Sequence, residues 1–439
     1  MSSKTQGSWG RFPAFAQTLH ACHWREELAG QLQSIAASHG STLAFGNGRS
    51  YGDSCMASSD HVVHMRTLDR FIAIDWKTGL VTAEAGVTLA EVLALAIPQG
   101  WFLPVTPGTR FVTLGGALAN DVHGKNHHVR GTFGRHVKRF GLTRSDRAPC
   151  VCSATENSEL FAATIGGLGL TGIIAWMEIQ LMPVQSSAIA TQTIRFDGLQ
   201  EFFALSGELD TQHEYSVSWI DCVASGKALG RGIFTVGDHA RDGDLKLKRS
   251  SELRVPFTPP VSMINTLSLR AFNTAYYRAH KTGRHHSQSY YEPFFYPLDR
   301  ILHWNRLYGP QGFQQYQCVV PEDSAADAIA ELLATIAVAG TGSFLAVLKR
   351  CGDIASPGLL SFPLAGSSLA LDFPQNPALD RMLRQLDDIT RAAGGRLYPA
   401  KDAHMSGDDF RECYPAWQQV ESLRDPAINS RFWKRVSST

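Results

Sequence analysis

The chain has 439 residues, of which 44% are hydrophobic and 18% charged, and its formal net charge at pH 7 is +1. This length allows two or three domain-sized units, and the near-neutral charge excludes the strong field that recruits nucleic acid or an anionic surface. The longest apolar stretch, around residues 89–105, is interrupted by Glu91, Pro98, Gln99 and Gly100, which excludes a membrane span there.

The opening residues, MSSKTQGSWGRFPAF, contain neither the apolar core of a secretory signal peptide nor a twin-arginine pair. Eight cysteines are scattered along the chain without a C-x-x-C motif, so we expect free thiols rather than a disulfide framework. Both features predict a protein of the cytoplasm.

Residues 41–185 alternate short apolar runs with glycine-rich turns. Residues 71–85 predict a β-hairpin, and the run after Thr88 predicts a helix, because Thr88 is a good N-cap and Glu91 follows at the capping-box position. Strands and helices do not alternate regularly here, which favours an α+β fold over a doubly wound sheet.

A second region begins near residue 186. Residues 322–340 and 376–395 predict amphipathic helices that end at glycines, with strand-like runs before and between them. We therefore expect helices laid over an antiparallel sheet. Within this region, residues 227–286 hold eleven Lys and Arg against four Asp and Glu, with few clear periods. They predict a mobile basic segment: a solvated loop, or else a lid or a contact for anionic lipid headgroups.

Three glycine-bearing segments, 45–53, 107–128 and 164–174, point to a bound pyrophosphate, since consecutive N–H groups in such turns form anion-binding nests. No G-x-G-x-x-G lies in a βαβ unit followed by an acidic residue, which argues against a Rossmann site. The P-loop motif is absent from the sequence. Each segment taken alone is also compatible with an ordinary tight turn.

The order of these segments resembles that of flavoproteins with the vanillyl-alcohol-oxidase (PCMH-type) FAD-binding domain. The segments GRSYGD, PGTRFVTLGGALANDVHGKNHH, GGLGLTGII, WNRLYGPQGFQQYQ and GGRLYPAKD, as an ordered set, look like the decaprenylphosphoryl-ribose oxidase family. The similarity runs from about residue 40 to about residue 425.

This resemblance implies a two-part FAD-binding domain, residues 1–185 completed by 395–439, and an antiparallel-sheet substrate domain covered by helices, residues 186–394. It implies oxidation of the C2 hydroxyl of a polyprenyl-phosphate-linked ribofuranose to a 2-keto sugar, with the hydride passing to flavin N5. An NAD(P)H-dependent short-chain dehydrogenase would then reduce the keto sugar to the arabinose epimer. Because the substrate is a lipid, peripheral contact with the inner membrane is also expected.

The resemblance also implies a set of flavin-binding residues. Many relatives carry a histidine covalently bonded to the flavin in the first loop, whereas this chain has Arg49, so we expect non-covalent FAD. The expected cofactor-binding residues are Gly48, Arg49, Ser50, Tyr51, Gly52, Asp53, Pro107, Gly108, Thr109, Arg110, Thr113, Gly115, Gly116, Asn120, His123, Gly124, Gly169, Thr171, Gly172, Ile174 and Tyr398.

Three residues are the expected catalytic groups. An alcohol gives up a hydride only if its hydroxyl proton also leaves, and the reduced flavin gains negative charge. Lys401 is the candidate cation or base, Tyr51 the candidate for proton relay, and His123 would lie beside flavin and substrate.

The expected substrate-binding residues are Lys125, Gln315, Gln317, Lys349 and Trp219. Gln315 and Gln317 stand two apart on a predicted strand, so they share a face on which their amides can meet sugar hydroxyls. Phe295 and Ala370 stand where mycobacterial relatives carry tyrosine and cysteine, and both changes reshape the pocket.

Three alternatives remain open at the level of sequence. The first is an aldonolactone or alditol oxidase on the same fold. The second is a flavin-binding partner subunit without activity. The third is a metal hydrolase built on His123 and His127, which the absence of H-E-x-x-H and of a nearby acidic residue after Asp121 disfavours, and we expect no metal.

Overall fold

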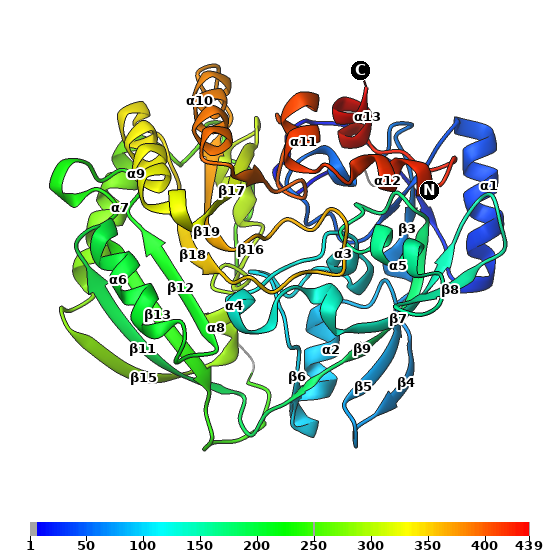
Figure 1. The fold of residues 1–439 in the computed structure, drawn as a ribbon, viewed down its shortest axis with the longest axis horizontal. Helices are drawn as coiled ribbons and strands as arrows, with labels where there is room; N and C mark the ends of the chain where they lie inside the picture. Colours follow the sequence, from blue (N-terminus) through cyan, green and yellow to red (C-terminus); the bar gives the residue numbers. More distant parts are fainter. Residues whose placement is uncertain (1–6, 249–250, 439) are drawn as a thin grey trace.

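The protein is described by a computed structural model that covers residues 7–248 and 251–438. Figure 1 shows two parts side by side, one built mainly from the first 185 residues together with the C-terminal helices, and one from the middle of the chain. The first part contains a three-stranded and a five-stranded sheet and the short strand pair β6–β10. The second contains one large sheet with helices on one face.

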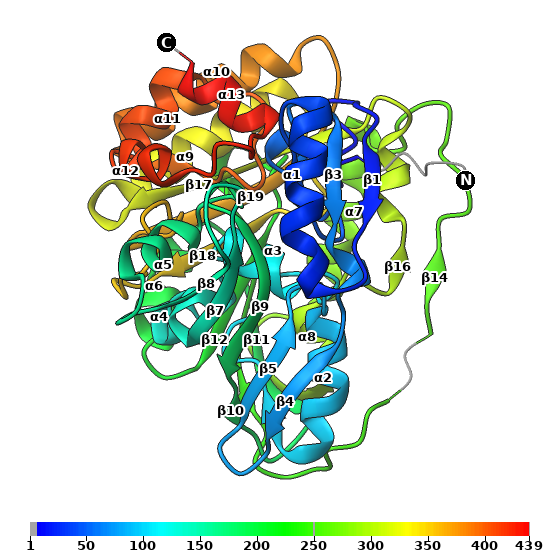
Figure 2. The same cartoon turned by 90° about the vertical axis from the view of Figure 1, so that its right-hand side faces the viewer.

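The first part begins with a small parallel sheet in the order β1-β3-β2, flanked by α1 (Figure 2). A five-stranded antiparallel sheet follows in the order β4-β5-β9-β7-β8. Its elements are β1 Thr18–Ala21, α1 Leu28–His39, β2 Leu43–Phe45, β3 His61–His64, β4 Phe71–Asp75, β5 Leu80–Glu84, α2 Leu89–Ala96, β6 Trp101–Phe102, α3 Leu114–Ala119, α4 His127–Arg130, β7 Val137–Thr143, β8 Cys150–Ser153, α5 Ser158–Thr164, β9 Ile173–Gln180 and β10 Met182–Pro183.

The predicted local elements of this part are present. The hairpin over 71–85 is formed by β4 and β5, and Thr88 caps α2 in a complete capping box with Glu91. The side-chain oxygen of Thr88 accepts from the backbone N–H of Glu91, while the carboxylate of Glu91 accepts from the backbone N–H of Thr88.

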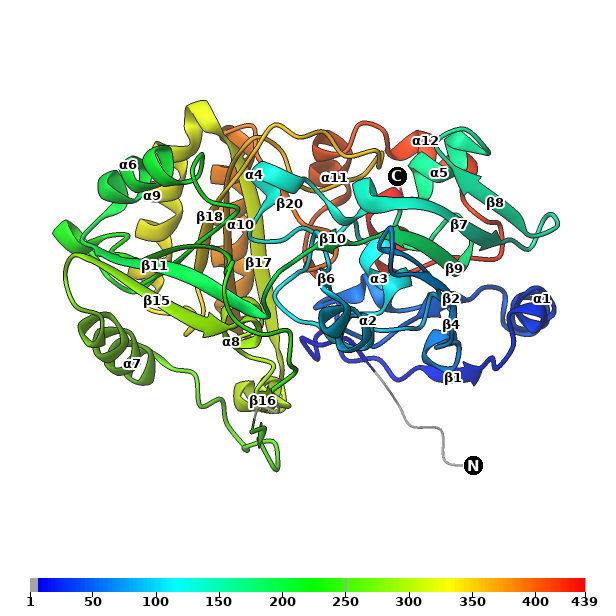
Figure 3. The same cartoon turned by 90° about the horizontal axis from the view of Figure 1, so that it is seen from below.

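The second part is an eight-stranded sheet in the order β15-β11-β13-β12-β18-β19-β17-β20. Helices α6, α9 and α10 pack on one face of this sheet (Figure 3). Its elements are β11 Ala188–Phe196, α6 Leu199–Leu209, β12 Tyr215–Ile220, β13 Gly232–His239, β14 Leu253–Arg254, α7 Thr266–Ala279, β15 Arg284–Tyr290, α8 Tyr291–Phe295, β16 Ile301–Leu302, β17 Phe313–Pro321, α9 Glu322–Ala339, β18 Val347–Cys351, β19 Gly366–Pro374, α10 Leu379–Ala392 and β20 Arg396–Leu397.

The C-terminal stretch joins the two parts. Strand β20 pairs with β17 in the large sheet. The chain then returns to the first part through α11 Gly407–Cys413, α12 Trp417–Leu423 and α13 Arg431–Ser437. Helix α12 contacts α5, and α13 contacts the short turn of helix at Asp53–Cys55.

Regular elements are present in residues 227–286, for which the sequence shows few clear periods and predicts a mobile basic segment. Their described part contains β13, α7 and β15, and both strands pair with β11. Residues 249 and 250 lie outside the described residues. The strand signal of β15 was missed because its sequence, RHHSQSY, is polar and exposed over most of its length, so it has no apolar alternation to detect.

The antiparallel sheets with helices laid over one face confirm the predicted α+β fold class. Among the described residues, no helix is long and apolar enough to cross a membrane.

Candidate active site

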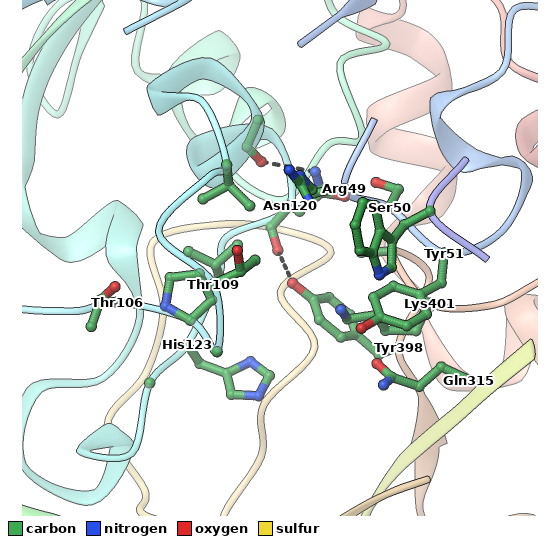
Figure 4. Close-up of a pocket in the computed structure, with 18 of the residues that line it drawn as sticks. Arg49, Ser50, Tyr51, Thr106, Thr109, Asn120, His123, Gln315, Tyr398 and Lys401 are labelled. Carbon is green, nitrogen blue, oxygen red and sulfur yellow. Dashed lines mark hydrogen bonds between the residues drawn. The ribbon is translucent and has the colours of Figure 1, made fainter. Parts of the chain in front are cut away.

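A cavity of about 510 Å³ lies between the two parts of the molecule. The first part contributes the predicted glycine segments, and the large sheet contributes the face that its helices leave uncovered. Figure 4 shows Arg49, Ser50, Tyr51 and Lys401 on one side of the cavity and His123 on another, with Tyr398 between them.

The loop after β2 forms one wall. Among the described residues, the backbone N–H groups of Asn47, Gly48, Arg49 and Ser50 have no hydrogen-bond partner. Gly48 adopts a φ of 58°, which favours glycine. A run of unpaired N–H groups beside a cavity is costly unless a ligand accepts from them, so this loop is built for an anion.

A second loop continues this wall. The N–H groups of Gly108 and Thr109 likewise have no partner in the described chain. A Cβ on Gly108 would meet no protein atom within 4 Å, so the backbone here borders open space. Nearby, a Cβ on Gly46 would lie 2.4 Å from Oγ1 of Thr113, which is why the two loops can approach so closely.

Arg49 is held by aromatic rings. Its guanidinium lies 4.1 Å from the ring centre of Trp9 and 5.2 Å from that of Phe111. Burial lowers its pKa, while the nearby Asp299 raises it. An arginine in this position has no nucleophilic atom to offer a flavin, which agrees with a dissociable cofactor.

The opposite wall follows the two-residue period of the large sheet. Alternate residues on neighbouring strands line the cavity: Val217 and Trp219 on β12, Gln315 and Gln317 on β17, and Val347 and Lys349 on β18. Tyr316, between the two glutamines, turns to the helices: its hydroxyl lies 2.7 Å from that of Thr390 on α10. Gln315 and Gln317 therefore share the face of β17 that borders the cavity, as their spacing predicts.

His123 sits where the two walls meet. The amide of Gln317 donates to its Nε2 at 3.2 Å, and its ring packs against Phe362 and Tyr398. The proton must then lie on Nδ1, which has no partner among the described residues. Burial, followed by Lys349, His127 and Lys401, holds the pKa of His123 well below its usual value, so the ring is neutral and offers one N–H to a ligand.

Three lysines line the cavity, of which Lys349 is buried and Lys125 and Lys401 are half-buried. Burial lowers the pKa of Lys401 to about 8 and that of Lys125 to about 7, and it also lowers that of Lys349. Lys349 donates to the carbonyl of Gly124 at 2.6 Å. The ammonium groups of Lys401 and Lys125 have no acceptor in the described protein; they lie 3.9 Å and 5.7 Å from the ring centres of Tyr51 and Phe294.

Asp372 is a charged neighbour of the site that the sequence did not reveal. It lies directly opposite Gln315 in the β17–β19 register, and its Oδ1 accepts from the amide of Gln315 at 2.6 Å. Burial raises its pKa to about 7, although Gln315 and Lys401 act in the other direction. The alternation in SSLALDFP places Asp372 on one face with Ala370, but only the register brings it beside Gln315.

The structure brings most of the predicted residues together around the cavity. Those that line it are Gly48, Arg49, Ser50, Tyr51, Pro107, Gly108, Thr109, Thr113, Gly115, Gly116, Asn120, His123, Gly124, Lys125, Gly169, Gly172, Ile174, Trp219, Gln315, Gln317, Lys349, Tyr398 and Lys401. The hydroxyl of Tyr398 donates to the carbonyl of Asn120 at 2.8 Å (Figure 4).

Four predicted cofactor residues do not line the cavity. Gly52 packs so closely on Asp402 that a Cβ would lie 1.7 Å from its carbonyl oxygen, and Asp53 pairs with Arg435. Arg110 pairs with Glu292, and the hydroxyl of Thr171 is bonded to that of Thr164 inside the first part. The side chains of Asp53, Arg110 and Thr171 are bonded to protein partners, and Gly52 is packed against Asp402, so these residues support the cavity from behind.

His127 and His128 are part of α4. His127 is buried, and His128 lies 3.1 Å from the carbonyl of His213 through Nε2. They belong to the wall behind His123 and Lys125.

Comparison with known proteins defines the class. Residues 17–146 match the family described as "FAD binding domain". A decaprenylphosphoryl-β-D-ribose oxidase from Mycolicibacterium smegmatis is 34% identical over 97% of this chain and 95% of its own length. An uncharacterized Streptomyces coelicolor protein is 32% identical over 77% of this chain and 95% of its own. A putative D-arabinono-1,4-lactone oxidase of Neurospora crassa is 27% identical over 30% of this chain and 23% of its own length.

The protein is thus an FAD-dependent oxidoreductase that acts on CH–OH groups, with a PCMH-type FAD-binding domain. Within that class, the chain belongs to the decaprenylphosphoryl-β-D-ribose oxidase family. The predicted enzyme class and cofactor are confirmed. The cavity also fits this cofactor, because its unpaired N–H groups at residues 47–50 and 108–109 suit a pyrophosphate and its unpaired lysines suit an acceptor that gains negative charge.

Proposed function

We propose that the protein oxidises the C2 hydroxyl of a polyprenyl-phosphate-linked ribofuranose to a 2-keto sugar, the first half of a ribose-to-arabinose epimerisation. The observation that carries the proposal is the charge of the cavity: Lys349, which is buried, and Lys125 and Lys401, which are half-buried, line it together with the carboxylate of Asp299, while Asp372 interacts with Lys401. Free alditols and lactones carry no negative charge to balance such a set, whereas a sugar phosphate does.

The loops at residues 47–50 and 108–109 would hold the pyrophosphate of FAD through backbone N–H groups. When bound, FAD supplies the acceptor for the hydride that leaves the carbinol carbon. The chain itself must bind the sugar, orient the hydroxyl and balance charge. Arg49 leaves no covalent attachment to the flavin, so we propose that FAD is dissociable.

Lys125 and Lys349 would bind the phosphate end of the substrate. Lys125 has an unpaired ammonium group among the described residues, and Lys349 keeps a fixed position through the carbonyl of Gly124. Gln317 and the Nδ1 donor of His123 would then reach ribose oxygens, and Trp219 would wall the sugar, its indole N–H being bonded to the carbonyl of Phe344 at 2.8 Å.

Lys401 and Tyr51 would act at the reacting centre. Burial holds the pKa of Tyr51 well above 10, so its phenol stays protonated and can orient the hydroxyl that is oxidised. Lys401 packs on the same ring and carries a charge with no hydrogen-bond acceptor among the described residues. We assign it the role of the cation that stabilises negative charge as it develops.

The test is anaerobic bleaching of flavin absorbance. Purified FAD-loaded protein is mixed with a polyprenyl-phosphoryl ribose, and in parallel with free ribose, an alditol and an aldonolactone. We expect loss of the flavin band with the lipid-linked sugar and little loss with the others. Efficient bleaching by the alditol or lactone, without response to the lipid-linked sugar, would establish the alternative oxidase. Bleaching by none of them would indicate an inactive flavoprotein.

We further propose that the enzyme meets its lipid substrate at a membrane surface. Leu253, Phe257, Val261, Met263 and Leu267 form an exposed apolar surface along the segment that includes β14 and the start of α7, which we call the apolar ridge. Leu267 and Phe257 leave 79% and 67% of their surface in contact with solvent, and several such apolar residues in one short segment are typical of an interaction surface. Figure 2 places β14 on an extended stretch at the edge of the molecule.

Charge and position both favour an anionic bilayer as the occupant of this surface. Along the sequence the exposed residues Lys248, Arg254 and Arg270 stand in or next to the ridge, against the single exposed acidic residue Glu252. Helix α7 also reaches the cavity, since Tyr276 lines it and packs edge-on against Trp219 at 4.7 Å. A lipid tail that leaves the cavity beside α7 would therefore enter the bilayer directly. This arrangement supports a peripheral position on the inner membrane.

The product also implies a partner reaction. A 2-keto sugar on a lipid phosphate must be reduced from the opposite face to give the arabinose epimer. The chemistry calls for a separate NAD(P)H-dependent short-chain dehydrogenase, which is the partner we propose.

A further inference from the structure

Three histidines outside the cavity come together on the outer side of the first part. They are His20 on β1, His39 at the end of α1 and His61 at the start of β3. One ring nitrogen from each lies within 4.8 Å of the others. None of the three lines the cavity, so the reaction proposed above does not explain them.

The fold itself creates this cluster. Strands β1 and β3 pair in parallel, with Thr18 opposite His61. His20 stands two residues after Thr18, so its side chain projects from the same face of the sheet as that of His61. Nε2 of His20 lies 2.9 Å from Nδ1 of His61. The ring of His39 then stacks on that of His61, with ring centres 3.5 Å apart and planes within 8°.

We propose that His20, His39 and His61 form a binding site for a divalent transition-metal ion, of the Zn²⁺, Ni²⁺ or Cu²⁺ class. Three imidazoles without a carboxylate in the group select these ions over Mg²⁺ and Ca²⁺, which prefer oxygen ligands. Three protein ligands leave a fourth position for water, and the partial exposure of the site supplies it.

One movement is needed for binding. In stacked rings the nitrogen lone pairs run side by side, so His39 must turn its ring to direct a nitrogen at the same point as His20 and His61. His39 is exposed and stands in the last turn of its helix, before Gly40, so its side chain is free to turn. His20 and His61 already lie close enough to exchange their shared hydrogen bond for two metal bonds.

The bound ion would connect three elements. It would tie β1 and β3 to the end of α1, a few residues before β2 and the loop that lines the cavity. Ligands that bind only the folded state stabilise it, so the expected effect of the metal is a higher Tm rather than a change in the chemistry of the cavity.

The test uses the FAD-loaded protein without an affinity tag, treated with EDTA and then titrated calorimetrically with ZnCl₂ alone. We expect about one equivalent of Zn²⁺ to bind and to raise the Tm by several degrees, whereas Mg²⁺ should not raise it. Bound Cu²⁺ should show nitrogen hyperfine splitting in its electron paramagnetic resonance spectrum. His39→Gln, on the surface, and His61→Gln should each abolish the binding and the Tm rise.

The matched control is the double variant His285→Gln/His286→Gln, which removes an adjacent exposed pair on β15 and should bind Zn²⁺ as the parent protein does. No Zn²⁺ binding by the parent, or equal binding by His39→Gln, would overturn the proposal. An equal Tm rise with Mg²⁺ would do so as well. None of these readouts depends on oxidase activity, so they stand apart from the test of the proposed function.

Discussion

Lys401 is the residue on which the chemistry of the cavity most depends. Its ammonium group packs on Tyr51 and is desolvated, so burial lowers its pKa to about 8, while the charge of Asp372 raises it. If its positive charge is what the reaction needs, flavin reduction must slow as the pH rises through this pKa. We expect that loss of rate above about pH 8, measured by anaerobic stopped-flow flavin reduction with saturating substrate.

Three substitutions test whether Lys401 acts as a cation or as a base. Lys401→Met should lower the rate of reduction by about 100-fold or more, the usual cost of losing one charge-stabilising donor. Lys401→Arg should keep part of the rate and lose the alkaline fall, because an arginine does not deprotonate. Asp372→Asn should move the fall to lower pH, since the lysine loses the charge that favours its protonated form. A rate that instead rises through pH 8 would make Lys401 the base.

At the residue scale, sequence resemblance located the side chains that line the cavity better than those that support it. Lys401 and His123 were predicted from motifs, and both line the cavity. Asp372 was not predicted because its contact with the site depends on which residue of β17 it faces, and a local sequence pattern does not determine strand register. Asp53 was placed at the cofactor because it belongs to GRSYGD, but its partner, Arg435, lies at the far end of the chain.

At the element scale, α13 is fixed to the cavity loops by one arginine. Arg435 lies 2.8 Å from Asp53, behind the first glycine loop, and 2.9 Å from Asp402, next to Lys401. Both carboxylates are buried. Burial raises the pKa of Asp53 despite the arginine, whereas Arg435 and His404 keep that of Asp402 below its usual value despite burial. The last helix thereby holds two walls of the cavity together.

Arg435→Met should therefore destabilise the protein by about 3 kcal/mol, because it removes the guanidinium that two buried carboxylates share and leaves Asp402 with His404 alone. It should also weaken FAD retention, since both carboxylates adjoin cavity-lining segments. Arg284→Met, which removes an exposed ion pair with Glu208, is the control and should cost about 1 kcal/mol or less. Denaturant unfolding of the FAD-free proteins and FAD titration measure the two effects. Equal stability of the two variants would show that the Arg435 network contributes no more than a surface pair.

Elements with a strong local signal were predictable, and those that depend on distant pairing were not. The capping box at Thr88 and the amphipathic helix over 322–340 are encoded within a few turns of chain, and both are present. Strand β15 gains its backbone partners from β11, almost a hundred residues earlier, and its own side chains are polar. This strand therefore forms because β11 supplies its backbone hydrogen-bond partners, not because of its own sequence.

At the scale of the whole molecule, the proposed site of oxidation and the proposed membrane contact lie at two ends of one wall of the cavity. The uncovered face of the large sheet lines the cavity, and α7 runs from that wall to the apolar ridge and its basic flanks. In the reaction proposed above, the long lipid tail of the substrate would not fit into a cavity of about 510 Å³ and would remain in another apolar phase while the sugar reacts. The ridge gives the molecule a surface that can dip into that phase without a membrane-spanning helix.

Vesicle binding tests this arrangement. The parent protein should sediment with vesicles that contain anionic phospholipid, bind neutral phosphatidylcholine vesicles poorly, and lose binding as salt is raised. Phe257→Ser/Leu267→Ser should lower the partition onto anionic vesicles by about tenfold or more, because each buried apolar side chain contributes about 1.5–3 kcal/mol. The control Ile72→Ser/Leu95→Ser changes exposed apolar residues of similar size on β4 and α2, away from the ridge, and should bind as the parent does. If the ridge variant and the control bound anionic vesicles equally well, the lipid would have to reach the cavity by another route.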